Sequence, residues 1–147
     1  MDIKIIYFDV RHAVDVHDWI IDNSGGRQGC HDVGQIDSVL ANIQNDDYYP
    51  ELVDKLTHLV HSVNKVHAFV DGNKRTSIAL GAYLLEINGF DYCVTRFVHE
   101  LENISVWVAE NRVSKELLRK IIYSIMMEDE FSEELKLAII SAVVGEV

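Results

Sequence analysis

The sequence predicts a mainly α-helical fold with a small β element near the N-terminus. Apolar residues recur every three or four positions through most of the 147-residue chain, which is the period of helices with one buried face. The contrasting segment is 3–8, IKIIYF, whose β-branched and aromatic residues are too few for a helix and predict a short strand. Pro50 is the single proline, and no repeat or linker-like stretch divides the chain. We therefore expect one domain spanning residues 1–147.

The spacing of apolar residues predicts seven helices. Pro50 followed by an acidic residue is typical of a helix start, and Asn88-Gly89 is typical of a helix end. The segment 91–95, DYCVT, is expected to be a short extended piece. The tail helix is expected to pack into the core through Leu135, Leu137, Ile139, Ile140, Val143 and Val144. The expected helices lie at about 10–23, 33–44, 50–65, 78–87, 97–111, 115–127 and 132–145.

Composition excludes several classes of partner. The formal net charge is −11, from 24 acidic and 13 basic residues, so no surface-wide positive field attracts nucleic acid. The longest nearly apolar run, residues 137–144, is far shorter than the roughly 20 residues of a membrane span. Two cysteines, with no CxxC pairing and no signal-like N-terminus, predict a protein of the reducing cytoplasm.

The segment 67–75, HAFVDGNKR, concentrates polar and charged residues between two predicted helices. At the start of the second helix, the backbone N–H groups around Gly72 and Asn73 are expected to be free and to face one point. Lys74 and Arg75 add full positive charges there. This combination predicts a site for an anion such as phosphate. Asn73 is expected either to cap the helix or to donate its amide to a phosphate oxygen.

Two further residues of this motif loop indicate catalysis rather than anion binding alone. The carboxylate of Asp71 would repel a phosphate unless a cation lay between them, and Mg²⁺ prefers carboxylate, phosphate and water oxygens. His67 carries a side chain that takes up a proton near neutral pH, so it is the candidate general base. Phe69 and Val70 are expected to anchor the loop by packing. The pattern predicts transfer of a phosphorus-containing group from a nucleotide to a hydroxyl.

A simpler interpretation is a helix–loop–helix turn in which Asp71 or Asn73 only caps a helix and the cations are solvated. Capping explains neither His67 nor the pair Lys74 and Arg75. The full set of residues therefore favours the catalytic interpretation.

The motif from His67 to Arg75 resembles the signature of the Fic superfamily: a histidine, any residue, phenylalanine, any residue, an acid, Gly-Asn, glycine or lysine, then arginine. Lys74 is the residue found in the death-on-curing (Doc-like) branch, where most Fic proteins have glycine. Segment 16–44 is similar to that branch's helix, Gly-Gly-x-x-Gly loop and helix, and segment 76–90 to its helix ending in Asn-Gly.

The resemblance implies a small Fic-type helical bundle and a toxin that uses ATP and Mg²⁺ to phosphorylate a hydroxyl of a protein, as the Doc-like branch does with elongation factor Tu, arresting translation. It implies that His67 is the base and Asp71 the Mg²⁺ ligand. It further implies that the nucleotide phosphates are held by Gly72, Asn73, Lys74 and Arg75.

The likeness also bears on the reaction and on its control. The second arginine of adenylylating Fic proteins falls at Ile78 here, which favours phosphate transfer over AMP transfer. The inhibitory helix of autoinhibited Fic proteins has its nearest counterpart in Ser124 and Glu128, but Asp129 stands where glycine or asparagine is required. We therefore expect a separate antitoxin.

Alternative functions remain open at this stage. A Fic-type adenylyltransferase and a non-catalytic binding module with the same fold are the main ones. The pairs His17-Asp18 and His31-Asp32 raise an HD-type metal phosphohydrolase, although His17 packing on its helix and Asp32 capping the next helix are simpler interpretations. His58 and His61, one turn apart, have the spacing of metal ligands but no third ligand nearby in the sequence.

Overall fold

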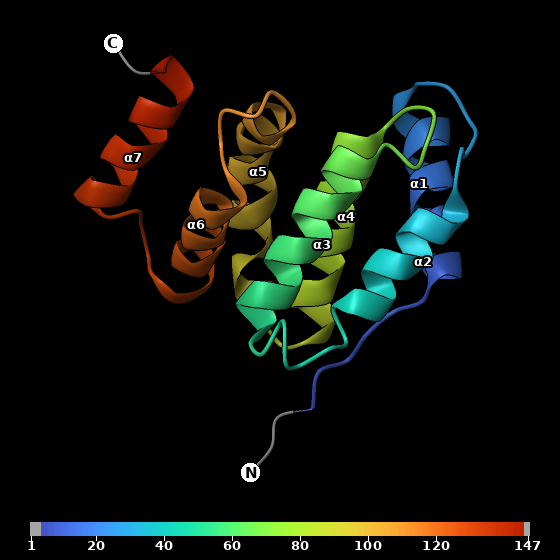
Figure 1. Cartoon of the computed structure of the whole chain (residues 1–147), viewed down its shortest axis with the longest axis horizontal. Coiled ribbons are helices and arrows are strands. Elements are labelled where there is room, and N and C mark those ends of the chain that lie inside the picture. The colour runs from blue at the N-terminus through green and yellow to red at the C-terminus, as the bar shows by residue number, and fades with distance from the viewer. Residues whose placement is uncertain (1–3, 146–147) are drawn as a thin grey trace.

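A computed structural model describes residues 4–145 and shows a mainly helical protein (Figure 1). The helices are α1 (Val10–Ser24), α2 (Val33–Asn42), α3 (Leu52–Val66), α4 (Asn73–Ile87), α5 (Val94–Ala109), α6 (Lys115–Met127) and α7 (Glu133–Val144). A short 3-10 helix, η1 (Asp91–Cys93), precedes α5. The seven predicted helices are confirmed, with small shifts at their ends.

Helices α3 and α4 form the centre of the molecule. Helix α3 packs against α2, α4, α5 and α6, and α4 packs against α1, α3 and α5 (Figure 1). Their inner faces are fully buried, as at Leu56, Leu59, Leu80 and Leu84. Because the motif loop joins these two central helices directly, its position is fixed by the core.

The predicted N-terminal strand is wrong. Residue 3 lies outside the described residues, and residues 4–9 form neither strand nor helix. The backbone of Ile6 is instead paired by one side chain, because its N–H donates to Asn88 Oδ1 (2.8 Å) and its C=O accepts from Asn88 Nδ2 (2.9 Å). An amide side chain at the end of α4 thus replaces the neighbouring strand that the sequence pattern required.

Three local predictions also need correction. Segment 91–95 is helical, since η1 leads directly into α5. Asp32 occupies the N-cap position of α2, but its side chain makes no capping hydrogen bond. The tail helix exists and packs on the core, but only along one side, through Leu135 and the partly buried Ile139. Leu135 is the one buried residue of α7, and the outer stripe of Leu137, Ile140 and Val144 is 65%, 58% and 68% exposed.

None of the helices within residues 4–145 combines the length and the apolarity needed to cross a membrane.

Candidate functional site

The motif loop begins with an unusual backbone conformation. Helix α3 ends at Val66, and His67 follows as its C-cap in the left-handed region, at φ 51° and ψ 45°. Residues other than glycine adopt this region at a cost, and such outliers concentrate at functional sites. The conformation ends the helix abruptly, and the His67 side chain is exposed to solvent. A partner can therefore reach the imidazole.

Asn73 closes the motif loop. Its Oδ1 accepts from the backbone N–H of Phe69 (3.1 Å), and its Nδ2 donates to the backbone C=O of the same residue (2.9 Å). Phe69 is itself 1% exposed, which confirms it as a packing anchor. Asn73 does not cap α4, because the N-cap residue is Gly72 and no side chain caps this helix. Its side chain braces the loop instead, and both of its polar groups are used by Phe69.

The glycine loop between α1 and α2 lies against the motif loop. Cys30 and Phe69 form an isolated antiparallel bridge. Around it, Val70 N–H donates to Gly29 C=O (3.0 Å), and His31 N–H donates to Ala68 C=O (2.7 Å). The glycine loop comprises residues 25–32, and its glycines allow a close approach to another segment. That segment is the motif loop of the same chain.

Asp71 is held as an ionised carboxylate. Its Oδ2 accepts from the backbone N–H of Arg27 (3.1 Å), and its Oδ1 accepts from the backbone N–H of Gly72 (2.8 Å). These two hydrogen bonds lower the pKa of Asp71, and the charges of Arg75 and Arg27 lower it further. Each oxygen keeps a lone pair, and the side chain is only partly buried, so the carboxylate can still bind a cation.

Asp71 fits Mg²⁺ only together with a bound phosphate. Within residues 4–145, no group of three or more His, Cys, Asp or Glu side chains is placed to hold a metal ion. Mg²⁺ commonly binds through one or two carboxylates while phosphate oxygens and water complete its shell. Asp71 beside a phosphate site meets that requirement.

The first turn of α4 has the free backbone groups expected of a phosphate site. Within the described chain, the backbone N–H groups of Asn73, Lys74 and Arg75 donate to no protein acceptor. Gly72 precedes them at φ 79°, a backbone conformation that favours glycine. Three free N–H groups at a helix N-terminus form an anion site.

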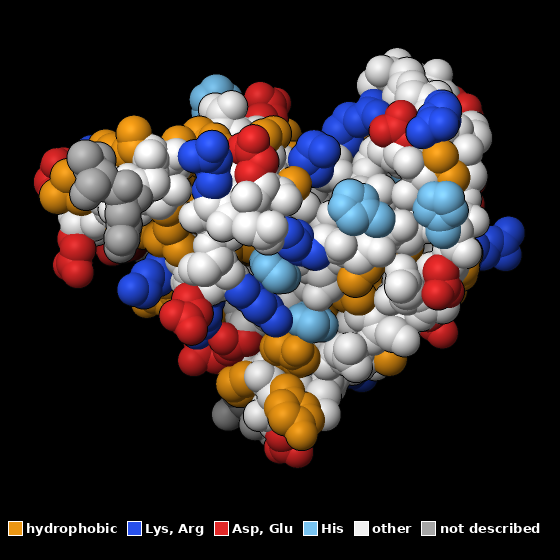
Figure 2. Space-filling view, turned by 45° about the horizontal axis from the view of Figure 1, so that its top comes forward, with side chains coloured by type: hydrophobic (Ala, Val, Ile, Leu, Met, Phe, Trp, Pro, Cys, Tyr) orange, Lys and Arg blue, Asp and Glu red, His pale blue; other side chains and the backbone are white. Residues whose placement is uncertain are grey.

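Two cations stand where the helix dipole disfavours them. Lys74 is exposed, and Arg75 donates from one guanidinium nitrogen to Ser24 Oγ (2.7 Å) and to Gly25 C=O (2.9 Å). Positive side chains in the first turn of a helix oppose the positive end of its dipole. A bound anion would offset this unfavourable interaction, because it is attracted both to the two cations and to the positive end of the helix dipole. Figure 2 shows Lys, Arg and His side chains on the face of the molecule that includes the top of Figure 1.

His17 also belongs to this site, although its sequence context did not predict a role at the motif loop. It is 0% exposed, and its Nε2 lies 2.7 Å from the backbone O of Asp71. Its Nδ1 lies 3.0 Å from Asp18 Oδ1, and its ring stacks on Phe69 with centroids 3.8 Å apart. A carbonyl only accepts, so Nε2–H donates and holds the Asp71 backbone. The available signal was a histidine in the apolar stripe of a helix, where burial demands hydrogen-bond partners.

The other histidine pairs do not form metal sites among the described residues. His31 is exposed, and its backbone, not its ring, bonds to the motif loop. His58 and His61 lie close to the ammonium group of Lys115, which disfavours a metal cation. The HD-type phosphohydrolase therefore has no assembled site here.

The Fic/DOC family matches residues 7–85, which include α1, the glycine loop, α2, α3, the motif loop and most of α4. The chain belongs to the Fic/DOC family. One relative within this family is the toxin Doc of Mycolicibacterium smegmatis, which is 37% identical over 89 residues, covering 58% of this chain and 68% of that protein. The Fic/DOC match contains every residue of the site described above, whereas α5, α6 and α7 lie beyond it.

Proposed function

We propose that this Fic/DOC protein is a Doc-like toxin that transfers the γ-phosphate of ATP to a hydroxyl group of a protein. The observation that carries the proposal is the free N-terminus of α4, with Lys74 and Arg75 in its first turn, beside the ionised Asp71 and the exposed His67. The similarity to a toxin Doc supports the same role.

The residues divide the reaction between them. His67 accepts the proton of the target hydroxyl, whose oxygen forms a bond to the γ-phosphorus. The bond from that phosphorus to the bridging oxygen breaks, and ADP leaves with the electron pair. The N–H groups of α4 and the charge of Lys74 stabilise the phosphate oxygens. Asp71 would hold Mg²⁺, which supplies charge neutralisation on the phosphates.

Phosphate transfer is favoured over AMP transfer by two positions. Lys74 places a cation at the first turn of α4, whereas position 78, which carries an arginine in adenylylating relatives of the family, is Ile78 and is 8% exposed in the core. Adenylyl transfer is the alternative. A non-catalytic module is disfavoured, because the strained His67 backbone and the two cations of α4 cost stability without a ligand.

The partners follow from the proposed role. The protein target is elongation factor Tu or another protein with an accessible hydroxyl, and a target in translation places the action in the cytoplasm. Inhibition comes from a separate antitoxin. Asp129 supports this, because it stands after Glu128 where the inhibitory motif requires glycine or asparagine.

Label transfer from ATP tests the proposal. The protein is incubated with Mg²⁺, a bacterial lysate and ATP labelled at the γ- or, separately, the α-phosphate, and a His67→Ala variant serves as control. Label on a protein from the γ position alone, reduced about 10²- to 10⁴-fold in the variant, is the expected result. Label from the α position would establish adenylyl transfer, and no label from either would favour the non-catalytic module. Purified elongation factor Tu as the sole acceptor tests the named target.

A further inference from the structure

A group of basic side chains lies on the outer face of α3, separate from the motif loop. His58, His61 and Lys65 follow one another at spacings of three and four residues, so they share one face of the helix. Lys115, the first residue of α6, joins them, since its Nζ donates to His58 Nδ1 over 2.9 Å. We refer to these four residues as the α3–α6 basic cluster. Figure 2 shows Lys and His side chains together in the middle of this face.

The cluster has no negative charge of its own. Within residues 4–145, no carboxylate lies within 4.0 Å of the ammonium group of Lys65 or Lys115, although the chain has a net charge of −11. The other cation of α3, Lys55, is paired with Asp46 at 2.6 Å. Uncompensated cations are therefore a property of this face, not of the helix as a whole.

Neutral groups satisfy the hydrogen bonds of the two lysines. Lys65 donates to the C=O groups of Val108 (3.4 Å) and Ala109 (3.5 Å) at the end of α5, and to Asn111. Lys115 donates to His58 and lies over the ring of Tyr49. These contacts hold the two ammonium groups in place but leave their full charges available to an outside partner.

The pKa values of His58 and His61 are lowered by burial and, in part, by the positive charges of the lysines beside them. Burial and then the charge of Lys115 lower the pKa of His58 to about 4. Burial, Lys115 and Lys65 lower the pKa of His61. His58 Nδ1 accepts from Lys115, so Nε2 carries the proton, and this buried N–H has no acceptor among the described residues. A carboxylate brought to this face would be attracted by the charges of Lys65 and Lys115.

The cluster leads to the candidate catalytic residue. Helix α3 ends at Val66, and His67 follows it directly. Residues 58 to 65 span about 10 Å along the helix axis at 1.5 Å per residue. His67 lies just beyond the upper end of this span, so a chain that follows the cluster towards the end of α3 arrives at the start of the motif loop.

We propose that the α3–α6 basic cluster docks an acidic segment of the protein substrate and so presents the acceptor hydroxyl to His67. The inference rests on the proposed phosphotransfer to a protein. An acidic protein segment fits better than RNA, because the cluster is short and the overall charge of −11 repels a long polyanion.

Direct binding tests the surface without any reaction. A twelve-residue oligo-glutamate peptide is titrated into the isotope-labelled protein at low salt while amide resonances are recorded by NMR. Shifts concentrated at His58, His61, Lys65 and Lys115 are expected, and they should disappear at high salt because the charges are screened. Shifts elsewhere, or none, would overturn the proposal. Tighter binding of an RNA oligonucleotide of equal charge at the same residues would overturn it in favour of nucleic acid.

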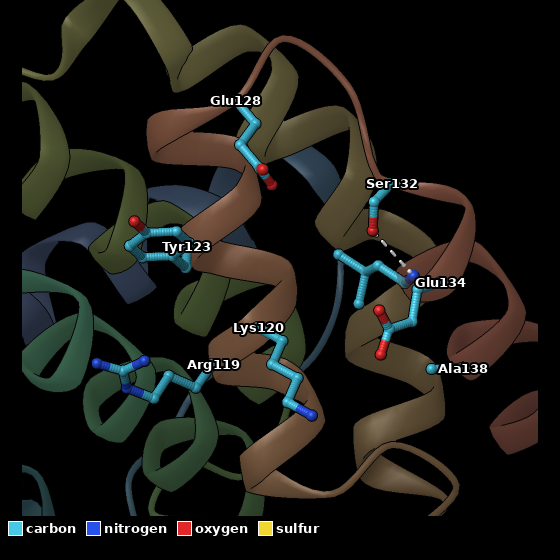
Figure 3. Close-up of a pocket in the computed structure, with 8 residues that line it drawn as sticks. Arg119, Lys120, Tyr123, Glu128, Ser132, Glu134 and Ala138 are labelled. Atoms are coloured by element: carbon cyan, nitrogen blue, oxygen red, sulfur yellow. Dashed lines mark hydrogen bonds between the residues drawn. The ribbon is translucent and has the colours of Figure 1, made fainter.

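Matched charge reversals connect the surface to the reaction. Lys115→Glu replaces one of the two lysine charges of the cluster with a negative charge, while Lys120→Glu makes the same change at another position of α6. Figure 3 shows Lys120 among the residues that line the pocket beside α7. Lys115→Gln removes the charge but keeps a hydrogen-bond donor for His58. Lys115→Glu is expected to lower label transfer to the lysate protein about tenfold, with ATP affinity unchanged. Lys115→Gln should lower it less, and Lys120→Glu not at all.

Equal label transfer by Lys115→Glu and Lys120→Glu would overturn the docking role. If the proposed phosphotransfer itself is wrong, the unmodified protein will transfer no label, but the peptide will still shift the resonances of the cluster. In that case the peptide shifts alone decide whether the surface binds acidic segments.

Discussion

At the motif loop, segments from α1, the glycine loop, α3 and α4 converge, whereas α7 packs mainly on α6 (Figure 1). Asp71 by itself accepts three hydrogen bonds. Its backbone O accepts from the His17 ring, and its carboxylate accepts from the backbone N–H groups of Arg27 and Gly72. In α7, by contrast, Leu137 on the outer stripe is 65% exposed. The motif loop and α7 were both predicted from clear sequence patterns. Such a pattern does not show how many contacts a segment makes with the rest of the chain.

The largest expected effect breaks the closure of the motif loop. Asn73→Ala leaves the backbone N–H and C=O of Phe69 without partners in a buried position, which should cost about 2 to 6 kcal/mol at about 1 to 3 kcal/mol each. Denaturant unfolding measures the loss. Asn73→Asp keeps the acceptor for the N–H and should lose less. If Asn73→Ala abolished label transfer without loss of stability, its side chain would be a phosphate ligand instead of a brace.

A methyl group tests how tightly the two loops fit. In Gly26→Ala, Cβ would lie 2.8 Å from Asp71 Oδ2, so the carboxylate must move, and label transfer should fall about 10²-fold. Gly25→Ala is the matched control, because Gly25 also has a positive φ but nothing lies within 4 Å of the added Cβ. Equal losses in the two variants would mean that backbone strain, not displacement of Asp71, is responsible.

His17→Phe keeps the stack on Phe69 but removes the hydrogen bond to the Asp71 backbone. The unpaired C=O should cost about 1 to 3 kcal/mol of stability. Because Asp71 then loses a support, kcat for label transfer should fall about tenfold while the KM for ATP changes little. Reduced stability with unchanged kcat would limit His17 to a structural role.

His58, on the outer face of α3, should make the free energy of unfolding depend on pH. The pKa of His58 is about 4 in the folded chain against 6.5 for an ordinary histidine, so the unfolded chain binds more protons between these values. The free energy of unfolding should therefore be highest above pH 6.5 and fall as the pH drops towards 4. Denaturant titrations at pH 7, 6 and 5 measure the slope. His58→Gln should flatten it, and an unchanged slope would assign the effect to other groups.

The smallest effect is expected on the outer face of α7. Leu137→Gln should change the free energy of unfolding by less than about 0.5 kcal/mol, because the side chain is mostly exposed. Leu135→Ala, on the inner face, should cost about 2 kcal/mol or more. A large loss for Leu137→Gln would show that this face is covered in solution.

The sequence by itself determined the helices and the composition of the motif loop. Helical period, caps and breakers are local properties, so the seven helices were predictable within a few residues at their ends. The motif residues from His67 to Arg75 are adjacent in the chain, and a helix N-terminus exposes its N–H groups wherever the helix lies. The free N-terminus of α4 beside these residues was therefore predictable without knowing its surroundings.

Only the tertiary structure decided what surrounds that site. The hydrogen bond from His17 to Asp71 joins residues 54 positions apart, and the bridge from Cys30 to Phe69 depends on how two loops meet. The backbone of Ile6 in the N-terminal segment is paired by the side chain of Asn88, and α7 lies at the surface with Leu135 as its one buried residue. Such outcomes depend on packing between distant segments, which the period of one segment does not contain.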